Sequence, residues 1–237
     1  MRPTLSIVLP CYNEAANLPE LLRRFRPFAD QCPFELILVN NGSTDDTAAV
    51  LARLLGDPAY RFARSHLVPV NQGYGYGIMA GLRAATGELL AYSHADLQCA
   101  PDDIIAAYDK WVASPDRDRL LVKGRRTRRR LSEAVITRGL QVLATAVLMT
   151  PLSDINGQPK VFPRQFLQTL THPPHDFTLD LYVLYRARRA GWRIDTVPVH
   201  FGKRLHGMSH WAFSWRSKMR TIRGFMKYLF VLRGQPS

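Results

Sequence analysis

The segment Leu89-Leu-Ala-Tyr-Ser-His-Ala-Asp-Leu-Gln-Cys-Ala-Pro-Asp-Asp103 decides the fold. Its four leading apolar residues predict a buried strand, and its last three residues combine an early proline with carboxylates, which favours the first turn of a helix. Asp96 is expected to project from the carboxyl end of the strand, with the amide of Gln98 two residues later on the same side. Hard oxygen donors of this kind suit a divalent cation. Alternatively, Asp96 only caps the helix region that follows.

The chain on either side repeats the same order of strand, polar turn and helix. Strands are expected at 5–10, 34–39, about 66–70 and 89–93, and a helix is expected after each. This alternation predicts a mostly parallel sheet covered by helices on both faces. Ligands of such sheets bind beyond the carboxyl ends of the strands. Four polar segments are expected to meet there: 10–14, 40–43, 71–77 and 94–98.

The second half of the chain elaborates this sheet. A strand is expected at 120–123, a basic loop after it, a long apolar helix from about 133, a helix after Pro163, another over 177–190, and a late strand at 193–199. No linker rich in Ser, Gly or Pro divides the chain, so we expect one domain over residues 1–210 and an appendage over 211–237.

Charge and cysteine usage limit the partners and the compartment. The formal net charge is +13, and basic residues concentrate at 117–130 and after Asp195. This asymmetry indicates a polyanionic partner: a phosphate ligand, an anionic membrane surface or a nucleic acid. The three cysteines form no CxxC pair, and no signal peptide is recognisable, which together predict a cytoplasmic protein. The longest apolar stretch, 134–152, is interrupted by Arg138 and Gln141 and is not expected to span a membrane.

The tail over 210–233 alternates large apolar side chains with arginine and lysine. This pattern is typical of an interfacial helix that lies on an anionic membrane, which predicts a peripheral location on the cytoplasmic face. A terminal helix that packs on the core, or one that binds a protein partner, remains an alternative. No nucleic-acid motif accompanies the basic charge, so no nucleic-acid partner is expected.

Three of the strand-end segments together resemble glycosyltransferase family 2, the inverting enzymes with the GT-A nucleotide-sugar-binding fold. They are Pro10-Cys11-Tyr12-Asn13-Glu14, Asn40-Asn41-Gly42-Ser43 and His94-Ala95-Asp96-Leu97-Gln98. The chain is more similar still to the dolichyl-phosphate mannose synthase group of polyprenyl-phosphate glycosyltransferases. That resemblance continues through Gly124-Arg125-Arg126, Thr137-Arg138-Gly139, Asp154-Ile155-Asn156-Gly157 and Arg204-Leu205-His206-Gly207-Met208-Ser209.

This resemblance implies an α/β fold of the GT-A type, with a mostly parallel central sheet flanked by helices. The pattern of the tail itself adds an amphipathic helix at the C-terminus. The resemblance implies a nucleotide-sugar site whose members are Pro10, Tyr12, Glu14, Asn41, Ala95 and Asp96. It also implies a divalent metal, Mn²⁺ or Mg²⁺, with Asp96, Gln98 and His94 as candidate ligands.

Two positions depart from the family pattern. Asn41 stands where the family usually has Asp, so a charge is lost and a hydrogen-bonding amide is kept. His94 stands where this group typically has the first Asp of Asp-Ala-Asp-Leu-Gln. Imidazole binds Mn²⁺ but suits Mg²⁺ poorly, so metal binding is expected to be weaker or biased toward Mn²⁺. Alternatively, His94 is not a ligand at all.

The predicted function is inverting transfer of a hexosyl group from a GDP- or UDP-sugar to a polyprenyl phosphate. The resemblance assigns phosphate contacts to Arg126, Arg138 and Arg204, and with Asp96 these are the candidate catalytic residues. Asp154 and Asp180 are candidates for contacting sugar hydroxyls or for ordering the basic groups. Two alternatives remain: a glycosyltransferase with a soluble or polysaccharide acceptor, and a nucleotide-sugar-binding protein without catalysis.

Overall fold

The computed structural model describes residues 4–127, 131–202, 205 and 215–234, and at 131–136 and 215–218 only the backbone. The described residues form one seven-stranded sheet in the order β3-β2-β1-β4-β6-β5-β7. The strands are β1 (Leu5–Cys11), β2 (Phe34–Asn41), β3 (Ala63–Val68), β4 (Leu89–Tyr92), β5 (Leu120–Thr127), β6 (Lys160–Pro163) and β7 (Arg193–His200). The helices are α1 (Leu18–Phe25), α2 (Thr47–Leu55), α3 (Tyr74–Ala84), α4 (Pro101–Ala113), α5 (Leu131–Leu148), α6 (Arg164–Leu167), α7 (Leu179–Arg189) and α8 (Trp215–Gly234). Three short 3-10 turns are η1 (Arg26–Phe28), η2 (Pro58–Tyr60) and η3 (Arg117–Arg119).

The sheet is parallel except for β6, which runs antiparallel to both β4 and β5. Helical crossovers place the carboxyl ends of β1, β2, β3 and β4 along one edge, as expected of a doubly covered α/β sheet. The predicted α/β fold with a mostly parallel sheet is therefore confirmed. The sequence did not predict β6, since four residues that contain a lysine and a proline give a weak strand pattern.

Alternate side chains of the strands enter two separate cores. Val8, Ile37 and Leu90 pack on one face beneath α3 and α7, whereas Ile7 and Leu36 pack on the other face beneath α1 and α4. This alternation explains why the strands read as continuous apolar runs in the sequence.

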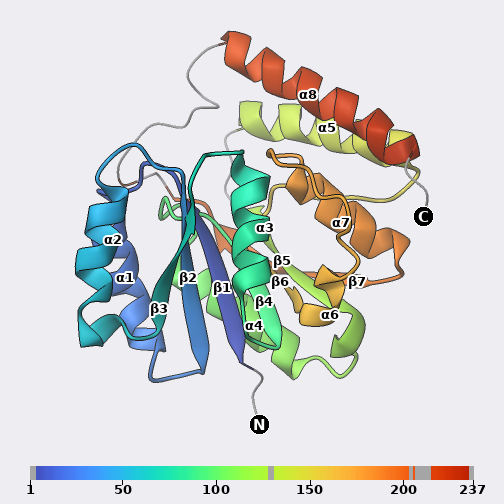
Figure 1. Ribbon diagram of the computed structural model, residues 1–237. Coiled ribbons are helices and arrows are strands. Elements are labelled where there is room, and N and C mark those ends of the chain that lie inside the picture. Colours follow the sequence, from blue (N-terminus) through green and yellow to red (C-terminus); the bar gives the residue numbers. More distant parts are fainter. Residues whose placement is uncertain (1–3, 128–130, 203–204, 206–214, 235–237) are drawn as a thin grey trace.

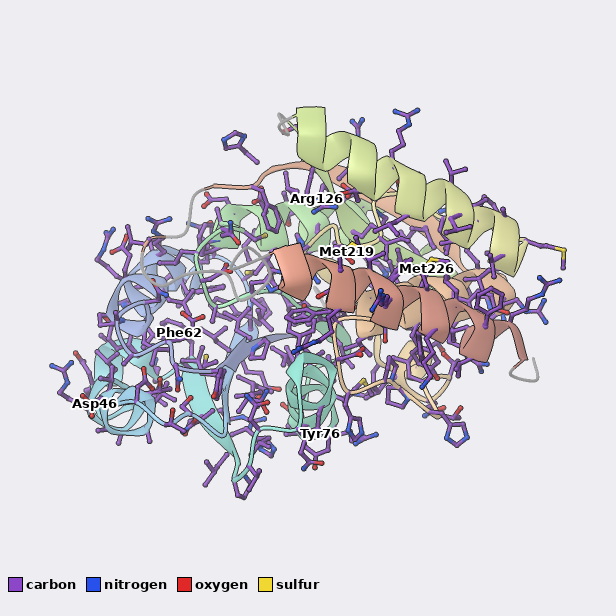
Figure 2. The ribbon with its side chains drawn as sticks, turned by 90° about the horizontal axis from the view of Figure 1, so that it is seen from above. Asp46, Phe62, Tyr76, Arg126, Met219 and Met226 are labelled. Carbon is purple, nitrogen blue, oxygen red and sulfur yellow. The ribbon has the colours of Figure 1, made fainter. Side chains whose placement is uncertain are left out.

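The helices α5 and α8 form a two-helix layer over the end of the molecule opposite the N-terminus (Figure 1). Leu229 and Leu232 of α8 are fully buried and share one core cluster with Ala144 and Leu148 of α5. In the view from above, Met226 lies on the side of α8 that faces α5 (Figure 2). The C-terminal helix is present as predicted, and one of its faces packs on the domain that precedes it.

Several apolar side chains of this layer are exposed. Phe230 is 60% exposed, Val142 63% and Met149, just after α5, 80%. None of the helices that the structure describes combines the length and the apolar character that crossing a bilayer requires.

Candidate functional site

The loops that follow β1 and β2 are locked together at the carboxyl edge of the sheet. Asn13 adopts a φ of 57°, and its side-chain oxygen accepts a hydrogen bond from the Thr44 backbone N–H at 2.8 Å. The Asn13 N–H donates to Ser43 Oγ at 3.1 Å, and the Glu14 N–H donates to Thr47 Oγ1 at 2.9 Å. Two segments about thirty residues apart in sequence are thereby fixed as one surface. Tyr12 lies exposed on it, next to the half-buried Pro10 and Glu14.

Asn41 connects this surface to the start of α3. Its side chain is buried, and its Nδ2 donates to the carbonyl of Gly73 at 3.0 Å. A Cβ at Gly77 would lie 2.7 Å from that same amide nitrogen, so only glycine allows this approach of α3. The structure thus gives Asn41 a role in holding the third loop, and its predicted contact with the nucleotide stays a prediction.

The Asp96 loop closes on itself and on the end of β7. Asp96 Oδ1 accepts a hydrogen bond from the Gln98 N–H at 3.1 Å, with Leu97 between them at a φ of 60°. Gln98 Nε2 donates to the Gly202 carbonyl at 3.1 Å, and the Gly202 N–H donates to the Gln98 carbonyl at 2.9 Å. Asp96 and Ala95 are both 3% exposed. This pairing fixes the orientation of the Gln98 side chain.

The residues present fit a divalent metal only in part. Within the described ranges, no three side chains of His, Cys, Asp or Glu gather as a protein cage for a metal would require. Asp96 supplies one buried carboxylate, and the amide nitrogen of Gln98 is held by Gly202. Mg²⁺ and Mn²⁺ in phosphate-transfer sites are bound by one or two carboxylates together with substrate phosphates. Asp96 fits such a shared site, in which the diphosphate of the donor would supply further oxygens.

Arg126 lies near this loop and is held by Asp154. The guanidinium donates from Nε at 2.8 Å and from Nη2 at 2.5 Å to Asp154 Oδ1, and the Arg126 backbone N–H donates to Oδ2 at 2.6 Å. Phe201 lies between the two halves of the site: its ring centroid is 5.9 Å from the guanidinium carbon and 6.2 Å from the ring of His94. The arginine side chain is 13% exposed.

Asp154 is itself fixed from three sides, at a φ of 39°. Its N–H donates to Gln141 Oε1 of α5 at 3.0 Å, and its carbonyl accepts from Lys123 Nζ at 2.8 Å. The neighbouring backbone packs closely on β5, since a Cβ at Gly124 would lie 1.8 Å from the Gln158 carbonyl oxygen. The arginine is thereby held by a loop that α5 and β5 fix in place.

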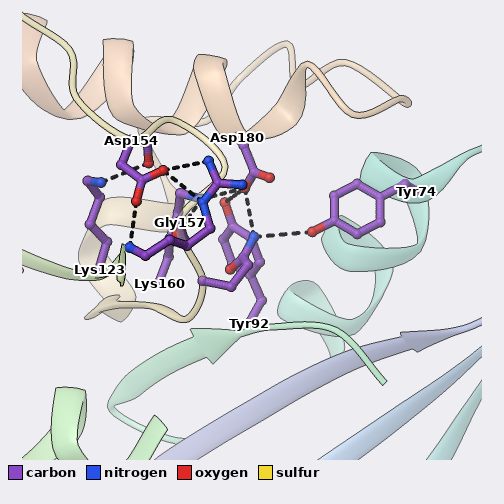
Figure 3. A network of polar contacts seen from close by, with 9 residues as sticks. Tyr74, Tyr92, Lys123, Asp154, Gly157, Lys160 and Asp180 are labelled. Atoms are coloured by element: carbon purple, nitrogen blue, oxygen red, sulfur yellow. Dashed lines mark hydrogen bonds and ion pairs between the residues drawn. The ribbon is translucent and has the colours of Figure 1, made fainter. Parts of the chain in front are cut away.

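A second ion pair lies behind the first (Figure 3). Lys160 Nζ donates to Asp180 Oδ1 at 2.5 Å, and the same oxygen accepts from the Tyr92 hydroxyl at 2.9 Å and from Gln158 Nε2 at 3.0 Å. Gln158 Nε2 also reaches the Tyr74 hydroxyl at 3.2 Å. Burial raises the pKa of both tyrosines, so both hydroxyls stay protonated, and that of Tyr92 donates to Asp180 while that of Tyr74 accepts from Gln158.

When all of its basic groups are protonated, this buried network carries an excess of positive charge. Among the described residues, two lysines and one arginine then face two aspartates, Asp154 and Asp180. Burial, and then repulsion from Lys160, lowers the pKa of Lys123 to about 7, so this amine is partly neutral near pH 7. An anion that approaches along the carboxyl edge of the sheet would favour its protonated form.

Of the other two arginines predicted to contact phosphate, the structure describes Arg138. Arg138 is exposed on α5, one turn before Gln141, the residue that accepts from the Asp154 N–H. Residues three apart lie on neighbouring parts of one helix face, so Arg138 belongs to the same side of α5 as this contact. Arg204 lies outside the described residues.

Sequence reasoning missed several members of the site, chiefly Lys123, Lys160, Tyr74 and Phe201. The sequence held a signal for the two lysines, since each stands beside apolar residues in a strand. In the structure each is at most 1% exposed. Lysine is rarely buried without a partner, so such a position indicates a charged network. Nothing in the sequence pattern places the two rings beside His94.

The fold and site together define a nucleotide-sugar glycosyltransferase of the GT-A type. Residues 6–171 match the family described as glycosyl transferase family 2. The chain belongs to this family and is a glycosyltransferase.

Two relatives and two solved structures illustrate the similarity. An undecaprenyl-phosphate 4-deoxy-4-formamido-L-arabinose transferase from Sodalis glossinidius is 42% identical over 48% of this chain and 35% of its own length. An uncharacterized glycosyltransferase from Mycobacterium tuberculosis is 32% identical over 95% of this chain and 97% of its own. A Pyrobaculum calidifontis mannosyltransferase, solved with GDP-Man and Mn²⁺, has a TM-score of 0.69 at 22% identity and covers 100% of this chain and 66% of its own. A glucosyl-3-phosphoglycerate synthase from Mycobacterium tuberculosis, solved with phosphoglyceric acid, has a TM-score of 0.74 at 20% identity over 99% of this chain and 81% of its own. The chain thus spans about a third of the length of the Sodalis relative.

Proposed function

We propose that the protein transfers a hexosyl group from a GDP- or UDP-sugar to a polyprenyl phosphate, with inversion at the anomeric carbon. One observation carries this proposal: in the view from above, Arg126 lies between α5 and α8, two helices that expose both apolar and basic side chains (Figure 2). A lipid phosphate has the matching chemistry, since its anionic head would meet the cations while its chain stays near the apolar layer. Relatives from Sodalis glossinidius and from an Enterobacter species, both named undecaprenyl-phosphate transferases, support this acceptor.

The donor is proposed to bind along the carboxyl edge of the sheet. Pro10, Tyr12 and Glu14 belong to the rigid surface made by the first two loops and would contact the base and ribose. Asp96, with Ala95 beside it, lies at the end of β4, where the diphosphate is expected. A divalent metal bound at Asp96 would neutralise charge that develops on the departing diphosphate.

The arginines are proposed to position phosphates. Arg126 is restrained by Asp154, and Arg138 and Arg204 are the further candidates. A lipid phosphate is already an anionic nucleophile at neutral pH, so no general base is needed. Much of the rate would then come from holding the acceptor oxygen in line with the bond to the leaving group.

The membrane location is part of the same proposal. The helices α5 and α8 would lie on an anionic membrane at its cytoplasmic face, with Phe230 and Val142 entering the headgroup region. Arg220, Arg223 and Lys227 are exposed on α8, and each is worth about 1 kcal/mol near such a surface. Residues 211–237 are proposed as the basic amphipathic appendage of a catalytic domain over residues 1–210.

A soluble acceptor is the second candidate function. A protein of the same fold, a glucosyl-3-phosphoglycerate synthase, was solved with phosphoglyceric acid, a soluble compound that carries a phosphate. Such an acceptor also carries a phosphate, so the excess positive charge beneath Arg126 suits both acceptors. The outer surface of α5 and α8 would then have no role in catalysis.

The test is transfer of radiolabelled sugar into an organic-extractable polyprenyl phosphate. UDP- and GDP-sugars are supplied with Mn²⁺, Mg²⁺ or a chelator, and Asp96→Asn is compared with Asp102→Asn, an exposed carboxylate in the first turn of α4. Label in the lipid phase that Asp96→Asn abolishes and Asp102→Asn preserves supports the proposal. Label that enters only phosphoglyceric acid, or another soluble acceptor, would contradict the lipid acceptor.

A further inference from the structure

His94 belongs to a row of rings that crosses the open edge of the site. The row consists of Phe177, Tyr74, His94 and Phe201. Phe177 stacks on Tyr74, with ring centroids 4.8 Å apart and planes at 19°. Tyr74 lies 5.5 Å from the imidazole of His94 at 30°, and His94 lies 6.2 Å from Phe201 at 86°.

The row runs between the two parts of the site that handle phosphate. At one end, Phe201 contacts the guanidinium of Arg126, and the next residue, Gly202, forms two hydrogen bonds with Gln98. In the middle, His94 stands two residues before Asp96 in the loop that follows β4, and the ring of Tyr74 lies beside its imidazole. The hexosyl group of a donor whose diphosphate lies between Asp96 and Arg126 would therefore meet these rings.

The row is rigid at its centre and open at its far end. The Tyr74 hydroxyl accepts a hydrogen bond from Gln158, within the network around Asp180. Phe177 is 57% exposed although it is stacked on Tyr74. An exposed aromatic ring on a fixed support offers an apolar surface at low entropic cost.

The ring contacts also account for histidine at position 94. An aspartate there would place a carboxylate beside the face of Tyr74, and aromatic faces carry negative charge density. An imidazole packs on this face without that repulsion. Two neighbouring rings contact it, and no described cluster of three His, Cys, Asp or Glu side chains includes it.

We propose that Phe177 and His94, with Tyr74 packed between them as their support, form a platform for the C–H face of the transferred sugar, and that His94 acts there as a ring and not as a metal ligand. This inference rests on the proposed nucleotide-sugar donor, and it does not depend on the acceptor. A pyranose presents one apolar face of C–H groups, which packs on aromatic rings. The platform would thus discriminate a sugar nucleotide from the bare nucleotide diphosphate.

The experiment measures binding of UDP, UDP-glucose, GDP and GDP-mannose by calorimetry, with Mn²⁺ and with chelator. Wild type is compared with His94→Ala, His94→Phe, His94→Asp and Phe177→Ala. We expect His94→Ala and Phe177→Ala to lower the affinity for the sugar nucleotide about 5- to 10-fold, the size expected for a lost ring contact. The affinity for the nucleoside diphosphate should stay within about twofold of wild type. His94→Phe should keep the affinity of wild type for the sugar nucleotide.

Two results would overturn the platform. One is equal weakening of diphosphate and sugar nucleotide by His94→Ala, seen only with Mn²⁺ and reversed by His94→Asp, which identifies a metal ligand. The other is unchanged binding of both ligands in His94→Ala and Phe177→Ala. Because no acceptor is present, failure of lipid glycosylation in the transfer assay would leave this measurement intact.

Discussion

The carboxylate of Asp154 binds both the backbone N–H and the guanidinium of Arg126. One carboxylate oxygen accepts from the Arg126 N–H and the other from the guanidinium, which burial and these contacts leave 13% exposed. Hydrogen bonds and charge from Arg126 keep the pKa of Asp154 below its ordinary value despite burial. The arginine is therefore oriented before any ligand binds, which lowers the cost of ordering it in the complex.

Replacing Asp154 by Asn should impair transfer through Arg126. We expect kcat/KM to fall about 10- to 100-fold, because a small misplacement of a phosphate-binding group is costly. The double variant Asp154→Asn/Arg126→Ala should be no worse than Arg126→Ala alone, since both changes remove one unit. The control is Asp195→Asn, which breaks a surface pair with Lys110. Additive losses in the double variant would contradict the positioning role.

Breaking the buried pair between Lys160 and Asp180 should destabilise the fold. Asp180→Asn leaves the lysine, which is fully buried, without a counter-charge, at a cost of about 3–5 kcal/mol in the free energy of unfolding. Replacing both residues together by Met and Leu should recover most of that loss. Urea denaturation of Asp180→Asn, Lys160→Met, Asp180→Leu and the double variant Lys160→Met/Asp180→Leu measures the coupling. A Lys160→Met/Asp180→Leu protein as unstable as Asp180→Asn would argue against an uncompensated charge as the cause.

The sequence predicts β1, β2 and β4 well because these strands are buried on both faces. The strand expected at 89–93 is β4, at Leu89–Tyr92. The helix expected after it is α4, which begins at Pro101 as predicted, after the Asp96 loop. β3 occupies 63–68, earlier than the expected 66–70, because its outward residues are polar and blur the apolar run. The antiparallel β6 was missed, since its pairing with β4 and β5 is a long-range property.

The site was predictable where it depends on loops and less so where it depends on packing. Asp96 and Gln98 follow directly from the end of a strand, and the structure finds them in one hydrogen-bonded turn. The ring contacts of His94 join residues from three distant segments, and no local pattern encodes them. Asn41 is a motif residue that was expected to contact the nucleotide. The structure buries its side chain against the start of α3, where it binds the Gly73 carbonyl.

Two glycines provide a matched test of the backbone contact that holds the Asp154 loop. Gly124→Ala would place a Cβ 1.8 Å from the Gln158 carbonyl oxygen, whereas Gly139→Ala on α5 meets nothing within 4 Å. We expect Gly124→Ala to lower the free energy of unfolding by about 1–3 kcal/mol or more. Gly139→Ala should raise it by about 0.8–1 kcal/mol through helix propensity. Thermal unfolding measures both, and equal effects would contradict the close approach of this loop to β5.

Stability should depend on pH through Lys123. Its pKa in the folded protein is about 7, below the ordinary value of 10.5, because of burial and repulsion from Lys160. From about pH 7 to 10 the unfolded chain therefore holds a proton that the folded protein has released, so the free energy of unfolding rises with pH. Asp154, Arg126 and Asp180 also face this amine. Lys123→Met should flatten the rise, and Lys110→Met, on the surface, should preserve it. Identical slopes in wild type and Lys123→Met would exclude Lys123 as the source.

Charge reversal on α8 should weaken membrane binding more than the same change elsewhere. Arg223 is exposed on α8, and Arg53 is exposed on α2, on the far side of the sheet from α8. Each basic side chain at an anionic surface contributes about 1 kcal/mol, so Arg223→Glu should reduce binding to phosphatidylglycerol vesicles about 10-fold or more. Arg53→Glu, which changes the net charge equally, should reduce it by less than about threefold. Cosedimentation at low and high salt measures both variants. Equal losses would attribute vesicle binding to the overall positive charge and remove α8 from the proposed interface.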